Sequence, residues 1–106
     1  MTNWVSIAKT EDVPEGEMIA TTIDDVELLV ANVEGDYRAI GSTCTHEGGN
    51  LAEGWIDGRE VTCPLHGSVF DLASGEAVGP PADEPVPVFD LRIEGEEIQI
   101  ARPRPA

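Results

Sequence analysis

The sequence predicts an all-β fold, because short apolar segments of strand length alternate with turn residues along most of the chain. Its 106 residues suit a single domain. Eight prolines and eleven glycines leave few windows for an amphipathic helix, so we expect little or no helix. The longest uninterrupted apolar run, residues 28–31, is far shorter than the roughly 20 residues of a membrane-spanning helix.

Six strands are expected in chain order, and several of them alternate apolar and polar residues as a sheet with one buried face does. Turn residues predict hairpins at Glu34-Gly35-Asp36, Asp57-Gly58 and Glu94-Gly95-Glu96. The expected strands cover residues 4–8, 18–23, 26–33, 37–40, 86–93 and 97–101.

The middle of the chain differs from its ends, because small residues and turn formers replace strand formers at residues 41–54 and 63–67. We therefore predict one domain over residues 1–106, with a β base formed by residues 1–40 and 80–106. A small subdomain of about residues 41–79 is expected to be carried on this base. The tryptophans, Trp4 and Trp55, are expected to anchor the packing.

The net charge of the chain limits the classes of molecule that it can bind. With 21 acidic and 6 basic residues, the net charge is −15, which argues against binding nucleic acid or an anionic membrane. We expect a monomer, because like charges repel. The acidic charge indicates either a basic partner protein or a role in solubility. The first residues do not resemble a secretory signal, so a cytoplasmic location is expected.

Every cysteine and histidine of the chain lies in two short motifs. Cys44-Thr45-His46 is followed, sixteen residues later, by Cys63-Pro64-Leu65-His66. Each motif offers one thiolate and one imidazole, so two adjacent loops would present four soft metal ligands. A tetrahedral zinc ion is one candidate, but zinc sites more often pair Cys with Cys and His with His. A two-iron cluster, with one iron taking the thiolates and the other the imidazoles, fits better.

These motifs resemble those of the Rieske iron–sulfur proteins, and the whole chain is similar to small soluble Rieske ferredoxins. The resemblance implies an antiparallel β sandwich or barrel base with a cluster-binding subdomain built from two loops. It also implies one Rieske-type 2Fe-2S cluster, with Cys44 and Cys63 on one iron and His46 and His66 on the other. The matching segments are Cys44-Thr45-His46-Glu47-Gly48, the run from Cys63 to Asp71, Ser74-Gly75 and Gly79-Pro80-Pro81.

The implied function is that of a one-electron carrier rather than an enzyme. Electrons would pass from a flavoprotein ferredoxin reductase to the terminal oxygenase of an aromatic-ring-hydroxylating system. One alternative is the small Rieske-like subunit of an assimilatory nitrite reductase. A zinc-stabilised interaction module is a further alternative.

Two departures from the high-potential branch of this family bear on the reduction potential. That branch joins its loops with a disulfide, and Gly49 and Leu65 occupy those positions here. Phe70 replaces a tyrosine that hydrogen-bonds a ligand sulfur, whereas Ser68 keeps a common hydroxyl. We expect a midpoint potential in the lower half of the range of about −150 to +300 mV known for such centres.

The resemblance also suggests roles for backbone and loop residues near the cluster. Gly48, Gly49 and Gly67 would allow backbone N–H groups to approach the sulfurs closely, or simply form tight turns. The Gly79-Pro80-Pro81 segment would cover the cluster and limit the access of water.

Overall fold

The computed structural model describes residues 3–44, 49–65, 67–80 and 82–101. Strands dominate this part of the chain, and its only helices are two single 3-10 turns, η1 (Thr10–Asp12) and η2 (Leu51–Glu53). The strands are β1 (Trp4–Lys9), β2 (Met18–Ile23), β3 (Val26–Val33), β4 (Asp36–Gly41), β5 (Trp55–Asp57), β6 (Glu60–Thr62), β7 (Val69–Asp71), β8 (Ala77–Gly79), β9 (Val88–Phe89), β10 (Leu91–Glu94) and β11 (Glu97–Ala101).

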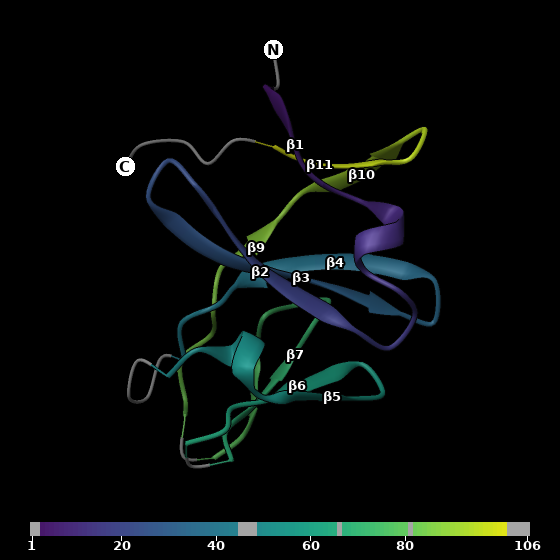
Figure 1. Cartoon of the computed structure of the whole chain (residues 1–106). Coiled ribbons are helices and arrows are strands. Elements are labelled where there is room, and N and C mark those ends of the chain that lie inside the picture. Colours follow the sequence, from purple (N-terminus) through teal and green to yellow (C-terminus); the bar gives the residue numbers. More distant parts are fainter. Residues whose placement is uncertain (1–2, 45–48, 66, 81, 102–106) are drawn as a thin grey trace.

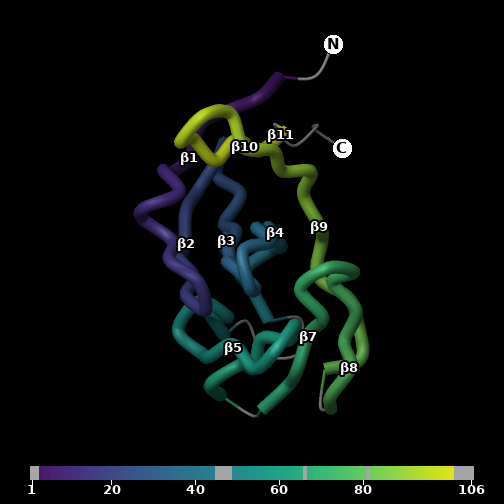
Figure 2. The backbone as a smooth tube through the Cα atoms, turned by 90° about the vertical axis from the view of Figure 1, so that its right-hand side faces the viewer, coloured from purple at the N-terminus to yellow at the C-terminus, as the bar shows by residue number. Residues whose placement is uncertain are grey.

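The strands form three antiparallel sheets that follow one another along the molecule (Figures 1 and 2). One end carries the sheet β1-β11-β10, in which the first and last strands pair. The sheet β2-β3-β4-β9 lies in the middle, and the sheet β5-β6-β7-β8 forms the opposite end. The middle sheet therefore separates two layers and has a buried face toward each.

Strand β3 shows how one strand serves two hydrophobic cores. Leu28 and Val30 point into a core shared with Ile98 and Ile100 of β11. The alternate residues, represented by Leu29, point into a second core that is shared with the sheet β5-β6-β7-β8. A strand buried on both faces has no reason to alternate apolar and polar residues, which explains the unbroken apolar run at residues 28–31.

The predicted hairpins are confirmed. Val33 pairs with Asp36, Asp57 pairs with Glu60, and Glu94 pairs with Glu97 across the three expected turns. Each turn contains one glycine with a positive φ, between +63° and +94°, a conformation that strains any residue with a Cβ.

The expected strand over residues 86–93 is divided in the structure. β9 pairs with β4, whereas β10 pairs with β11 in another sheet, and Asp90 stands between them. The alternating pattern continues through residue 90, so sequence periodicity alone does not mark the change of sheet. Strands β7 and β8 were not expected, because segments of three residues are too short to show a period of two.

The described helical segments contain one turn each, so none is long enough to cross a lipid bilayer.

Candidate metal centre

Cys44 and Cys63 occupy equivalent places in two loops. The N–H of Cys44 donates to the carbonyl of Gly49, and the N–H of Cys63 donates to the carbonyl of Ser68, both over 2.7 Å. In each case the acceptor lies five residues after the cysteine. We call residues 44–49 the first loop and residues 63–68 the second loop. Each loop thus begins with a cysteine whose amide ties its two ends together.

The flanking backbone fixes both loops on the β framework. On the first loop, Thr43 forms an antiparallel bridge with Asn50, and the N–H of Leu51 donates to the carbonyl of Ser42 over 2.7 Å. The second loop joins two paired strands, β6 and β7. Gly67 has a φ of +78° and donates its N–H to the carbonyl of Cys63, so its role as a turn glycine is confirmed.

The two loops are in contact. A Cβ placed on Gly49 of the first loop would stand 2.7 Å from Cδ1 of Leu65 and 3.1 Å from Sγ of Cys63, both in the second loop. The sulfur of one cysteine therefore lies against the residue to which the other cysteine is hydrogen-bonded. The expectation that the loops lie side by side is met for the residues that the structure describes.

Both cysteine side chains are buried, with Cys44 3% exposed and Cys63 1% exposed. They belong to the same apolar core as Phe70, which is fully buried. Two buried cysteines in one apolar core suit an iron–sulfur cluster, because binding to iron compensates the cost of burying two thiolate charges. The described residues therefore fit the thiolate half of such a site.

The imidazole half of the predicted site, His46 and His66, lies outside the described residues, as does Gly48. Among the described part of the chain, no three metal-ligating side chains come together. The structure thus describes two of the four predicted ligands and places both in the same buried cluster.

A third segment is attached to the second loop through Ser68. The buried Ser68 hydroxyl accepts a hydrogen bond from the N–H of Ala82 over 3.1 Å. Gly79 of β8 also lies against Val69, because a Cβ on Gly79 would stand 2.9 Å from the Val69 Cβ. The ends of the proline-containing segment are therefore held by β7 and by the second loop, although Pro81 itself lies outside the described residues. Sequence analysis did not predict this use of Ser68.

Asp71 organises the turn that leads from β7 to β8. Its Oδ1 accepts hydrogen bonds from the N–H of Ser74 over 3.0 Å and of Ala73 over 2.7 Å. These two bonds, to Ser74 and then Ala73, together with the charge of Arg59, lower the pKa of the Asp71 carboxyl. An aspartate followed by Ser74-Gly75 is a turn signal that the sequence could have shown.

The lowered pKa of Asp71 predicts how the stability of the fold depends on pH. A carboxyl with a lowered folded-state pKa stabilises the fold above its unfolded-state value of about 3.9, and this stabilisation is lost as the pH falls through the folded-state pKa. We expect a ¹³C NMR titration of the Asp71 carboxyl to give a midpoint below about 3.9. The Asp71→Asn variant, which lacks this titration, identifies the signal. A midpoint at or above the unfolded-state value would contradict the turn geometry.

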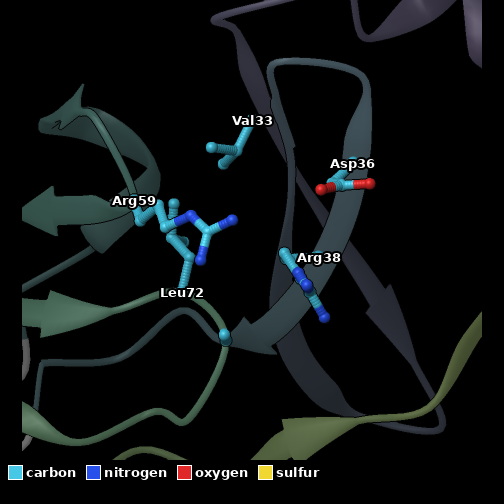
Figure 3. A pocket seen from close by; sticks show the side chains of 6 residues that line it. Val33, Asp36, Arg38, Arg59 and Leu72 are labelled. Atoms are coloured by element: carbon cyan, nitrogen blue, oxygen red, sulfur yellow. The ribbon is translucent and has the colours of Figure 1, made fainter.

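Two of the six basic residues line a groove between the middle sheet and the sheet that carries the second loop (Figure 3). Arg38 comes from β4, and Arg59 comes from the turn before β6. The remaining lining residues are Val33, Asp36, Leu72 and Ala73, so neither cysteine contributes to the groove.

The expected packing role of the tryptophans is wrong for Trp55. Its side chain is 55% exposed and lines an open groove with Met18 and Ile56. Trp4 is half-buried, and the guanidinium of Arg92 lies 4.6 Å from the centroid of its ring. Trp55 and Asp57 lie on the exposed face of β5, whereas Ile56 between them packs against the buried core.

Comparison with known proteins gives consistent matches. Residues 3–90 match the family model of the Rieske [2Fe-2S] domain. The ferredoxin component of a naphthalene 1,2-dioxygenase system from Pseudomonas aeruginosa is 32% identical over 97 residues, covering 92% of this chain and 93% of the relative. The ferredoxin of carbazole 1,9a-dioxygenase from Nocardioides aromaticivorans IC177 superposes with a TM-score of 0.92 at 28% identity, covering 96% of this chain and 100% of that one.

Two further solved structures bear on the alternatives. A complex of reduced oxygenase and oxidized ferredoxin in carbazole 1,9a-dioxygenase matches with a TM-score of 0.87 at 28% identity, over 92% of both chains. A structure named as an NADH-dependent nitrite reductase small subunit from Mycobacterium tuberculosis matches with a TM-score of 0.85 at 22% identity, over 98% of both chains, which shows a common fold only. The family match covers most of the sequence, including the first and second loops. The chain therefore belongs to the Rieske [2Fe-2S] domain family.

Proposed function

We propose that this protein is the ferredoxin component of an aromatic-ring-hydroxylating oxygenase system and that it carries one electron at a time. Its donor would be a flavoprotein reductase and its acceptor a terminal oxygenase. The observation that carries this proposal is the match, over nine-tenths of the chain, to proteins named as dioxygenase ferredoxins. The solved complex of such a ferredoxin with its oxygenase supports the direction of transfer.

The cofactor of the family is a Rieske-type 2Fe-2S cluster, which changes its charge by one electron when reduced. We propose that Cys44 and Cys63 hold one iron and that His46 and His66 hold the other. The buried positions of both cysteines support the thiolate half of this assignment. A cluster also explains the mixed Cys/His motifs better than a zinc ion does.

The residues around the cysteines would shield the cluster from water. The apolar core that contains Phe70 keeps water away from the cysteine side of the site. The segment tied to Ser68 is proposed to cover a second side. Because Phe70 has no hydroxyl, it cannot stabilise a reduced centre by donating a hydrogen bond to sulfur, which agrees with an expected potential in the lower half of the family range.

We also propose the division into a base, residues 1–40 and 80–106, and a cluster-binding subdomain of about residues 41–79. The sheet β5-β6-β7-β8, which carries the second loop, lies within the latter range. We further propose that the protein is monomeric and cytoplasmic. In that reducing compartment the cysteine thiols would stay reduced until they bind iron.

The function is tested by following one electron through the protein. The dithionite-reduced protein should show the low average g value of mixed Cys/His ligation in electron paramagnetic resonance. In anaerobic stopped-flow experiments, the reductase and oxygenase of the naphthalene dioxygenase system serve as donor and acceptor. We expect rapid reduction by the first and reoxidation by the second. Co-purification with a large sirohaem-containing subunit, without electron transfer to any oxygenase, would instead support the nitrite reductase alternative.

Charge should control the encounter with these partners. The described second-loop residues carry no charged side chain, whereas the chain as a whole has a net charge of −15. An acidic surface attracts a basic partner over long range, and a small apolar contact region within it lets the partner dissociate quickly. We expect the second-order rate of reduction by the reductase to fall about tenfold between low salt and about 0.5 M salt. A rate that does not change with ionic strength would contradict electrostatic steering.

A further inference from the structure

Leu65 is the side chain through which the second loop reaches the first. It lies two residues after Cys63 and one before His66, where 55% of its surface is exposed. Its isobutyl end nevertheless lies over Gly49 of the first loop. A Cβ on Gly49 would stand 2.7 Å from Cδ1 and 3.0 Å from Cγ of Leu65. The side chain thus fills the space that a residue larger than glycine would need.

The same contact lies beside both cysteines. The Cβ position of Gly49 is only 3.1 Å from Sγ of Cys63, and the Gly49 carbonyl accepts the N–H of Cys44. Gly49 is itself buried, although Leu65 next to it is largely exposed. The Leu65 side chain is therefore the outer layer over a point where the sulfur of one loop meets the backbone of the other.

We propose that Leu65 is a positioning residue for the metal centre. Its side chain holds the two loops together and keeps water from the Cys63 sulfur. This role rests on the proposed ligand set. An apolar side chain contributes no ligand, but surrounding residues control solvent access and thereby the stability and potential of a metal site. Water that reached the sulfur would donate hydrogen bonds to it, and these would favour the reduced, more negative state. Gly49 is the complementary residue, because a side chain there would displace Leu65 from its place over the first loop.

The test compares purified, cluster-loaded variants of the full chain. In protein-film voltammetry, Leu65→Ala is expected to show a higher midpoint potential than the parent protein. An iron chelator should also remove its cluster about tenfold faster, as measured by the loss of visible absorption. Leu65→Met, which keeps a flexible apolar side chain of similar volume, should behave like the parent. Because Leu65 is mostly exposed, the alanine variant should keep the fold, which far-UV circular dichroism checks.

A second pair of variants tests the contact itself. Gly49→Ala should incorporate less iron, because its Cβ displaces the Leu65 side chain from the first loop and also comes within 3.1 Å of Sγ of Cys63. The double variant Gly49→Ala/Leu65→Ala should recover the part of that loss that is due to Leu65. If Leu65→Ala keeps both the potential and the rate of cluster loss, or if the double variant loads less iron than Gly49→Ala, the positioning role is wrong. Failure of the parent protein to bind two irons would instead overturn the proposed function, so the two failures are distinguishable.

Discussion

Cys63→Ser is expected to reduce the iron content from about two atoms per chain to about zero. Serine has nearly the shape of cysteine, so the 1% exposed position stays filled and the amide can still donate to the Ser68 carbonyl. Its hydroxyl does not ionise near neutral pH, however, and does not provide the soft anionic ligand that iron–sulfur clusters use. Iron and acid-labile sulfide analysis of the purified variant measures the effect. The same loss is expected for Cys44→Ser.

The control for this experiment is Thr62→Ser, a comparable change at the residue directly before Cys63. It removes one methyl group from the end of β6 and leaves all four proposed ligands in place, so its iron content should equal that of the parent protein. His46→Ala and His66→Ala extend the test to the two proposed ligands outside the described residues. A Cys63→Ser protein that retains two irons and an unchanged electron paramagnetic resonance spectrum would show that the ligand assignment is wrong.

Gly54→Ala is expected to have the largest effect on stability of any single methyl group added near the site. Gly54 follows η2, and a Cβ there would overlap the carbonyl oxygen of Thr62 and stand 3.2 Å from Cδ of Pro64. These two residues flank Cys63, and backbone atoms cannot rotate away as side chains can. We expect a loss of about 3 kcal/mol of folding free energy, together with lower iron incorporation.

Gly58→Ala is the matched control, because it makes the same change in the next hairpin. Gly58 has a φ of +63° and no atom within 4 Å of the added Cβ, so only backbone strain of about 1 kcal/mol is expected. Thermal unfolding followed by circular dichroism should show a fall in Tm of about 15 °C for Gly54→Ala and about 5 °C for Gly58→Ala. If the two variants showed equal falls in Tm and equal iron content, Gly54 would not determine the position of the second loop.

The sequence alone was sufficient for the all-β class, the three hairpins and the cluster motif. Turns such as Glu34-Gly35-Asp36 depend on local backbone conformation, which a few adjacent residues control. The motif is likewise readable, because two cysteines and two histidines at this spacing leave few metal sites to choose from. Membership of the Rieske [2Fe-2S] domain family confirms that interpretation of the motif, whereas the role of each ligand residue remains a prediction.

Tertiary structure decided what depends on partners distant in the chain. The break at Asp90, the short strands β7 and β8, the exposure of Trp55 and the bond from Ala82 to Ser68 all result from which segments pack together. The same is true of Leu65 and Gly49, sixteen positions apart and joined only when both loops are folded. Local sequence specifies turns and ligand types because their energies are local. The insulation around the cysteines depends on contacts between the loops, so only the folded chain reveals it.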